Sequence, residues 1–156
     1  MPRQTLKAND TLFGAEGICY AVIDGNVEEM MYVKTISATV EKNKVEIPVL
    51  GQTGRKHKSG GWTGTGSMTI YDVTSIFRRQ TLEYIKNGKD TYFTIYFEND
   101  DPNSGIGRQA VALKGVNFDS MIMGQLDIET EAMEVDMDFT FHDIDMPETF
   151  KPVVLE

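Results

Sequence analysis

The residues of this chain that could perform acid–base chemistry are carboxylates near its C-terminal end. Residues 1–125 carry 14 acids and 14 bases, whereas residues 126–156 carry ten acids and the single base Lys151, which accounts for the whole formal net charge of −9. Catalysis by two carboxylates requires different environments within one cleft, so that one is protonated while the other is ionised. These acids form a uniform series instead, and acid–base catalysis is therefore not the favoured interpretation.

The spacing of these acids is typical of β-strands. Leu126–Ala132 alternates apolar and acidic residues, and Val135–Phe141 has a similar alternation of apolar and polar residues. Because successive side chains of a strand point to opposite faces, each segment is predicted to present its acids on one face and its core residues on the other. A file of carboxylates without opposing bases repels itself, so folding alone gives no reason to keep it. We interpret these acids as the lining of a passage for another polyanion.

Other motifs that could hold a ligand are weaker. The run Asn99–Gly105 offers oxygen atoms to a hard cation, but it lacks the EF-hand spacing and its closing Glu. The glycine series Gly60–Gly66 precedes a strand and no Gly-Lys-Ser/Thr follows it, so a phosphate cradle is not indicated. Neither His57 nor His142 has a partner at metal-ligand or triad spacing. We expect no catalytic residue, metal or cofactor, and we expect Cys19 to be a small buried hydrophobe.

The elements that position these residues are mainly predicted strands. Ile18–Ile23 and Val27–Val40 are predicted as strands around the turn Asp24-Gly25-Asn26. In Arg108–Phe118 the apolar phase shifts across Gly115, as a β-bulge would shift it. Further strands are predicted at Ser67–Tyr71 and Tyr92–Glu98.

Two segments depart from the strand pattern. Residues 41–66 contain six glycines and little apolar content after Leu50, which predicts a long protruding loop. Apolar residues from Val73 to Ile85 recur at helical spacing, which predicts a helix over about 73–87 with Asp72 as its N-cap and Gly88 at its end.

The expected fold class is mainly β, an antiparallel β-sandwich or barrel with one flanking α-helix (about 73–87) and a long protruding loop (about 41–66). The 156 residues suit a single domain spanning 1–156, with residues 1–14 and 147–156 as arms that either stay flexible or contact other subunits. No stretch approaches the length of an apolar membrane helix, so we expect a soluble protein without a membrane partner.

The charge distribution also favours self-assembly. The predicted loop carries the basic cluster Arg55–Lys58 and the aromatic residue Trp62, while the C-terminal strands carry acids. Such surfaces complement one another on identical copies. A closed ring of β-domains removes unpaired sheet edges, and stacked rings need protrusions that reach the next ring.

Several segments resemble the tail tube proteins of PBSX-like prophages and related contractile phages. In chain order these segments are Val40–Gly51, Gly54 with Lys58, Gly64–Ile70, Asn99–Pro102, Val111–Val116 and Glu131–Phe141. Their order and spacing carry the resemblance over roughly residues 15–150. It implies a barrel or sandwich subunit, related in fold to the tube protein of type VI secretion, that forms hexameric rings stacked into the inner tube of a contractile tail.

The resemblance implies a role for each group of charged residues. Acids on the lumen wall would keep passing DNA from adhering; these are Asp127, Glu129, Glu131, Glu134, Asp136 and Asp138. Contacts to the neighbouring ring would come from Arg55, Lys56, Lys58 and Trp62. Arg78 and Arg79 on the outer helix would face a sheath. The implied partners are further copies of the chain, sheath, baseplate and tape-measure proteins, and the implied location is the virion tail, reached from the host cytoplasm.

Alternatives remain open at this stage. A monomeric acidic β-domain that binds a basic partner would use the same acidic face, and a small hydrolase would depend on two of the carboxylates. The sequence also leaves open which acidic phase faces the lumen. An infectious phage, a defective prophage or a contractile bacteriocin could each use such a subunit.

Overall fold

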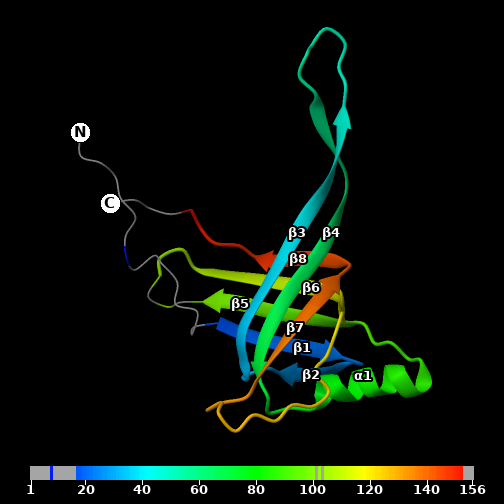
Figure 1. The fold of residues 1–156 in the computed structure, drawn as a ribbon. Coiled ribbons are helices and arrows are strands. Elements are labelled where there is room, and N and C mark those ends of the chain that lie inside the picture. The colour runs from blue at the N-terminus through cyan, green and yellow to red at the C-terminus, as the bar shows by residue number, and fades with distance from the viewer. Residues whose placement is uncertain (1–7, 9–16, 101, 103, 153–156) are drawn as a thin grey trace.

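The computed structural model describes residues 8, 17–100, 102 and 104–152. Within these residues the chain forms eight strands and one helix (Figure 1). The elements are β1 (Gly17–Ile23), β2 (Asn26–Glu29), β3 (Val33–Ile47), β4 (Lys56–Tyr71), α1 (Ile76–Asn87), β5 (Phe93–Asp100), β6 (Arg108–Phe118), β7 (Glu134–Phe141) and β8 (Asp143–Glu148).

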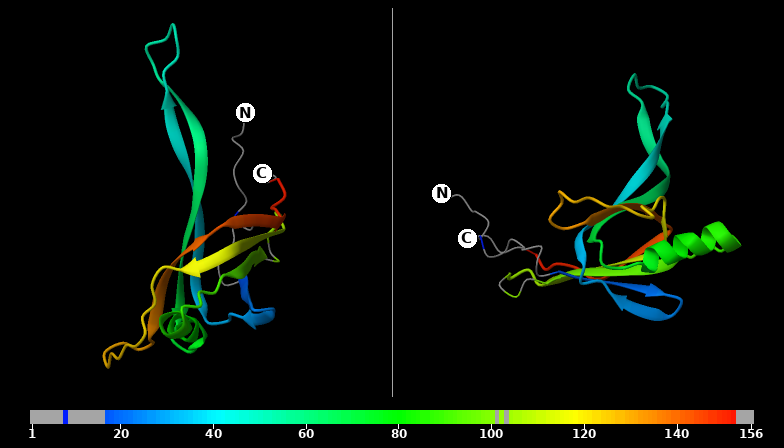
Figure 2. Two further views of the ribbon diagram at one scale, coloured as in Figure 1. Left: turned by 90° about the vertical axis from the view of Figure 1, so that its right-hand side faces the viewer. Right: turned by 60° about the horizontal axis from the view of Figure 1, so that its bottom comes forward.

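The strands are antiparallel and follow the order β2-β1-β5-β6-β7-β4-β3, with β8 beside β6. Strand β6 joins two halves of the sheet. One half contains β1, β2, β5 and β8, and the other contains β3, β4 and β7. Strand β6 pairs with β5 from Arg108 to Val116, while its last residues, Asn117 and Phe118, pair with β7. Figure 2 shows the β3–β4 hairpin crossing the strands of the other half. The expected antiparallel β fold with one helix is confirmed, but the sheet is not closed into a barrel, because β2 and β3 end the strand order.

The core lies between the two halves of this sheet. Apolar alternation is observed in β7, where every second side chain from Val135 to Phe141 is buried. Helix α1 packs through Phe77, whose ring centroid lies 6.0 Å from that of Phe93 and 5.0 Å from that of Phe118. The largest fully buried side chains come from both halves: Met68, Ile95, Leu113, Val116, Met137 and Phe139.

Two predicted backbone features are confirmed. The β1–β2 hairpin turns at Asp24 and Gly25, with φ of 51° and 81°. Gly115 has a φ of 68°, and the β5–β6 register shifts beside it. The predicted strand 27–40 is interrupted, however, between the end of β2 and the start of β3, where Met30 turns into the core and is 2% exposed. A buried apolar side chain there outweighs continuation of the strand.

The predicted loop over residues 41–66 is wrong as a loop, although the segment does protrude. Strands β3 and β4 pair as far as Ile47 and Lys56, so a hairpin occupies most of the range. The prediction was wrong because glycines are unfavourable in strands and therefore indicate a loop. A Cβ at Gly64 would lie 2.4 Å from the ring of Phe141, and one at Gly66 would lie 2.4 Å from the ring of Phe139. These glycines therefore make room for aromatic rings of β7 within a regular strand.

The strand predicted for Leu126–Ala132 is also wrong. Residues 119–133 connect β6 to β7 without regular secondary structure. The physical reason is that a strand needs a hydrogen-bonded neighbour, and β4 and β6 pair with β7 instead. Residues 126–132 thus have the side-chain alternation of a strand, but they have no neighbouring strand among the described residues to pair with their backbone.

Helix α1 begins three residues later than predicted. Its N-cap is Ser75 rather than Asp72, and no side-chain hydrogen bond caps it. The Asp72 carboxylate instead forms an ion pair with Arg78. The predicted end is confirmed, because Gly88 adopts a left-handed conformation and donates its N–H to the Tyr84 carbonyl.

The predicted terminal arms lie mostly outside the described residues. Residues 1–7 and 9–14 of the first arm, and 153–156 of the second, are not described. The first residues of the second arm, 147 and 148, belong to β8. Its backbone is tied down by pairing with β6, as at Ala110 and Glu148.

Candidate functional site

The outward face of β3, β4 and β7 carries short hydroxyls and carboxylates in register. Side chains on the opposite face of these strands enter the core, so the outward set is selected by strand parity. Three rows cross the strands: Thr35, Thr69 and Asp136; Ser37, Ser67 and Asp138; and Thr39, Thr65 and Thr140. We call these nine residues the hydroxyl–carboxylate face. The sequence pattern identifies its two acids but not its seven hydroxyls, although three of them, Thr65, Ser67 and Thr69, recur with a period of two in one segment.

Hydrogen bonds link side chains across the strands of this face. The Thr69 hydroxyl donates to Oδ1 of Asp136 over 2.7 Å, and the hydroxyls of Ser37 and Ser67 lie 3.2 Å apart. Asp136 and Asp138 are nevertheless exposed to solvent. The surface therefore presents negative charge and small polar groups rather than long side chains that could grip a ligand.

At the edge of this face, Glu134 is neutralised by a base. Lys34 Nζ lies 2.8 Å from Glu134 Oε1. This contact raises the pKa of Lys34, because its ammonium group gains a charged hydrogen-bond partner. Of the three β7 acids proposed for the lumen, Asp136 and Asp138 thus remain as the charge of the face.

The other three acids predicted for the lumen lie elsewhere. Asp127, Glu129 and Glu131 belong to the β6–β7 connection, not to a strand beside β7. Asp127 closes a local turn by accepting hydrogen bonds from the Glu129 N–H, at 3.0 Å, and from the Thr130 hydroxyl, at 2.7 Å. These bonds lower the pKa of Asp127 by stabilising its carboxylate. The structure thus separates the six acids into two groups of three.

The predicted inter-ring residues lie along the protruding hairpin. Strand β7 pairs with β4 no further than Gly64, so the hairpin beyond that residue projects from the sheet as two strands (Figure 1). Arg55, Lys56 and Lys58 lie near its tip, and Arg55 Nε is 3.5 Å from Glu46 Oε1. Trp62 is 44% exposed and lies near the base, with its ring centroid 6.1 Å from that of Phe141.

The two arginines predicted to face a sheath are not equivalent. Arg78 forms a two-pronged ion pair with Asp72, at 2.7 and 3.1 Å, and donates from Nε to the Ile122 carbonyl at 2.8 Å. Gln125 donates to the same Asp72 carboxylate and to the Glu134 carbonyl. Arg78 therefore anchors the β6–β7 connection, a role that sequence analysis missed. Arg79 is exposed.

The ion pair also sets the charge state of Asp72. Hydrogen bonds from Arg78 and then Gln125 hold the pKa of the Asp72 carboxyl below its ordinary value. Both side chains of the pair are largely shielded, with Arg78 18% and Asp72 16% exposed. These charge-assisted hydrogen bonds attach the first part of the β6–β7 connection to Arg78 of α1 and to Asp72.

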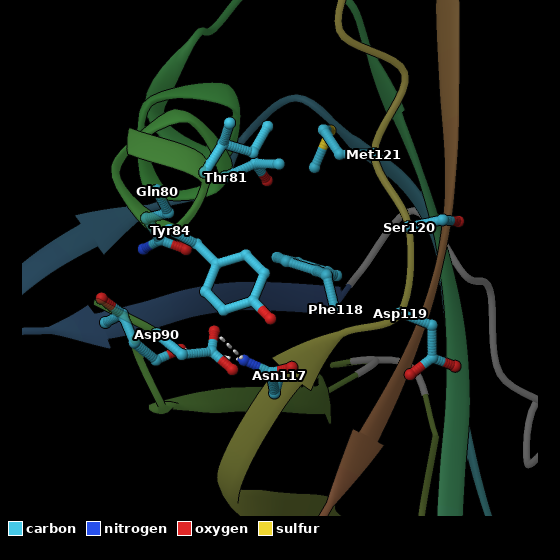
Figure 3. Close-up of a pocket in the computed structure, with 11 residues that line it drawn as sticks. Gln80, Thr81, Tyr84, Asp90, Asn117, Phe118, Asp119, Ser120 and Met121 are labelled. Atoms are coloured by element: carbon cyan, nitrogen blue, oxygen red, sulfur yellow. Dashed lines mark hydrogen bonds between the residues drawn. The ribbon is translucent and has the colours of Figure 1, made fainter. Parts of the chain in front are cut away.

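A separate depression lies beside α1 (Figure 3). Phe118 and Tyr84 are among its lining residues, and the Asn117 side chain donates to Asp90 Oδ1 over 2.7 Å. The Thr81 hydroxyl donates to the Phe77 carbonyl. These polar groups serve local structure, so the depression offers packing surface rather than an arrangement for acid–base chemistry.

In the described part of the chain, no group of three or more His, Cys, Asp or Glu side chains is placed to hold a metal ion. The same residues contain no helix long and apolar enough to span a membrane. Cys19 is buried as expected, and burial raises the pKa of its thiol to about 12.

Two proteins of Bacillus subtilis (strain 168) are similar to this chain over most of its length. The chain is 46% identical over 143 residues to the phage-like element PBSX protein XkdM, and the matched region covers 92% of this chain and 95% of that protein. It is 45% identical over 146 residues to the uncharacterized protein YqbM of the same organism, covering 94% and 97% of the two chains.

Solved structures share the fold at low sequence identity. One is a chain of an extracellular contractile injection system, the PVC sheath–tube complex in its extended state. It matches with a TM-score of 0.67 and 8% identity, over 89% of this chain and 93% of that chain. The family model described as phage tail tube protein matches residues 4–148. With this match and the relatives in Bacillus subtilis, the chain belongs to the phage tail tube protein family.

Proposed function

We propose that this tail tube subunit forms hexameric rings that stack into the inner tube of a contractile phage tail or phage-tail-like particle, with the hydroxyl–carboxylate face lining the lumen. Its role is structural, and no catalytic step is assigned to it. In the assembled tail its partners are copies of itself, together with sheath, baseplate and tape-measure proteins. After synthesis in the host cytoplasm it resides in the virion tail.

The observation that carries the lumen assignment is the composition of the hydroxyl–carboxylate face. Proteins hold DNA mainly through Lys and Arg contacts to phosphates. Asp136 and Asp138 repel phosphates instead, and the surrounding Ser and Thr side chains are too short to wrap around a strand of DNA. A wall of this kind lets DNA and tape-measure protein pass without adhering.

Assembly also resolves an edge problem. Among the described residues, β2 and β3 end the strand order, so each has one edge without a neighbouring strand. Contacts around a closed ring would cover such edges, which otherwise promote irregular association. The hairpin beyond Gly64 would then reach the neighbouring ring with Arg55, Lys56 and Lys58, and Trp62 would lie near its base.

Electron microscopy tests the assembly directly. The purified protein would be imaged in negative stain and its mass measured by light scattering over a range of salt, because salt screens repulsion among acidic faces. We expect rings or hollow tubes. A strict monomer in every condition, including coexpression with the baseplate and tape-measure proteins, would contradict the proposal and favour a monomeric binding domain.

The lumen assignment needs a separate readout. Tubes carrying Asp136→Lys and Asp138→Lys are expected to retain nuclease-resistant DNA at low salt, because lysines on the inner wall would bind phosphates. The matched control is Asp143→Lys with Asp145→Lys, two exposed acids at the same spacing on β8. Equal retention of protected DNA by both tubes would contradict the assignment.

A further inference from the structure

Two elements at opposite ends of the molecule expose apolar side chains together with opposite charges. The hairpin tip, residues 44–58, lies at the top of Figure 1, and the β6–β7 connection lies at the bottom. If subunits stack along the direction in which the hairpin projects, as its proposed reach to the neighbouring ring requires, the end with the hairpin tip faces the opposite end of the next subunit. These two elements are therefore placed to meet.

The hairpin tip combines apolar and basic residues. Leu50 is fully exposed, and Val45 and Ile47 are 54% and 37% exposed. Val45 pairs with Lys58 and Ile47 pairs with Lys56, so these four side chains share one face of the hairpin. The tip carries four bases against the single acid Glu46. Beyond Gly64 it projects by about eight residues, or about 25 Å, as an isolated pair of strands, which is marginally stable without support.

The β6–β7 connection combines apolar and acidic residues. Leu126 and Ile128 are 95% and 97% exposed, and they alternate with Asp127 and Glu129. The segment is held at its start, where Arg78 bonds to the Ile122 carbonyl and Gln125 bonds to Asp72. Nearly complete exposure of two large aliphatic side chains on an anchored segment is characteristic of an interaction surface.

We propose that the hairpin tip of one subunit docks on residues 126–132 of a subunit in the next ring. Val45, Ile47 and Leu50 would cover Leu126 and Ile128, while Lys56 and Lys58 face Glu129 and Glu131. The strand-like alternation of 126–132 then has a use that the isolated subunit does not reveal. The inference rests on the proposed stacking of rings and names the segment that receives the hairpin.

Other elements at the lower end fit the tip less well. The exposed bases of α1, such as Arg79 and Lys86, would repel the lysines of the tip. The β1–β2 hairpin offers the exposed acids Asp24 and Glu29, but its two exposed aliphatic side chains lie apart, Val27 beside the turn and Ile18 near the start of β1. Residues 126–132 offer two aliphatic side chains and three acids, and so match the tip in both respects.

Charge reversal tests the pairing. Lys56→Glu with Lys58→Glu, and separately Glu129→Lys with Glu131→Lys, are expected to convert tubes into single rings, because like charges then face each other across the contact. Combining the four changes is expected to restore tubes in electron micrographs. The control is the Lys56→Glu, Lys58→Glu variant with Glu29→Lys added, which should not restore tubes. Rescue by that control, or failure of the fourfold combination, would overturn the docking.

A disulfide trap tests the same contact without reversing charge. Tubes of the Ile47→Cys, Ile128→Cys variant should yield a 47–128 disulfide between chains under mild oxidation, identified by mass spectrometry of peptides. Buried Cys19 stays present as an internal reference. The matched variant, Ile47→Cys with Val27→Cys, should yield no such link. Tubes without the 47–128 link would overturn the docking but not the proposed function, whereas absence of rings and tubes from the unaltered protein would overturn both.

Discussion

Residues 126–132 and 135–141 share an alternation of apolar with polar residues, yet one segment is a loop and the other a central strand. In β7 the apolar residues from Val135 to Phe141 are buried, and the strand pairs with β4 at eight successive positions. In the connection, Leu126 and Ile128 stay in solvent. Alternation therefore specifies which side chains share a face, whereas strand formation depends on a neighbouring backbone.

The largest expected difference between the two segments concerns apolar truncation. Phe139 is fully buried, so Phe139→Ala should lower the free energy of unfolding by about 3–5 kcal/mol. Ile128→Ala in the connection should change it by no more than about 0.5 kcal/mol. Urea denaturation of unassembled protein measures both. Similar losses for the two variants would show that the connection packs more tightly than its exposure indicates.

A smaller effect is expected from the glycines that face β7. In Gly66→Ala the new Cβ would lie 2.4 Å from the Phe139 ring and 2.6 Å from the Ser37 carbonyl, which should cost about 1–3 kcal/mol. Gly54→Ala is the matched control, because nothing lies within 4 Å of the added atom. Urea midpoints distinguish them, and equal midpoints would contradict the close packing of β7 on β4.

The anchoring of the connection can be broken separately. Arg78→Ala removes the ion pair with Asp72 and the bond to the Ile122 carbonyl, and should cost about 1–2 kcal/mol. Amide hydrogen exchange should accelerate over residues 120–133 while β7 stays protected. Arg79→Ala, a change at an exposed neighbour, should have neither effect. Unchanged exchange in the Arg78 variant would show that the connection is held by other contacts.

The same ion pair predicts the smallest effect, a pH dependence. The pKa of Asp72 is lower in the folded chain than its ordinary value of 3.8, so its contribution to stability is present above that value. The contribution is lost as the pH falls through the folded pKa. Denaturation of Asp72→Asn between pH 6 and pH 2 should therefore show a weaker acid dependence than the unaltered protein. Asp138→Asn, at an exposed position, is the control, and equal curves for Asp72→Asn and the unaltered protein would contradict this role.

Several elements could be predicted because their signals are local. The Asp24–Gly25 turn and the Gly115 bulge require residues that accept a positive φ, and Gly88 ends the helix for the same reason. The alternation of β7 correctly separated its core residues from Asp136 and Asp138. Such features depend on the residue and its immediate neighbours in the chain.

The errors arose where a distant segment decides the outcome. The hairpin was predicted as a loop because Gly64 and Gly66 are unfavourable in strands until the rings of β7 lie over them. Asp72 is a typical N-cap residue by type and position, but the folded chain brings its carboxylate to Arg78, and Ser75 takes the N-cap position. The hydroxyl half of the candidate site was missed because Ser and Thr mark a surface only once β3, β4 and β7 lie side by side.

Three properties can be seen in the amino-acid sequence alone: the mainly β fold with one helix, the excess of acids in the last fifth of the chain, and the resemblance to the phage tail tube family. Which acids share a face with the hydroxyls, and which lie in the β6–β7 connection, is visible only in the folded chain. The physical reason is that chain-local periodicity orients side chains, whereas hydrogen bonding between distant strands decides which of those side chains become neighbours.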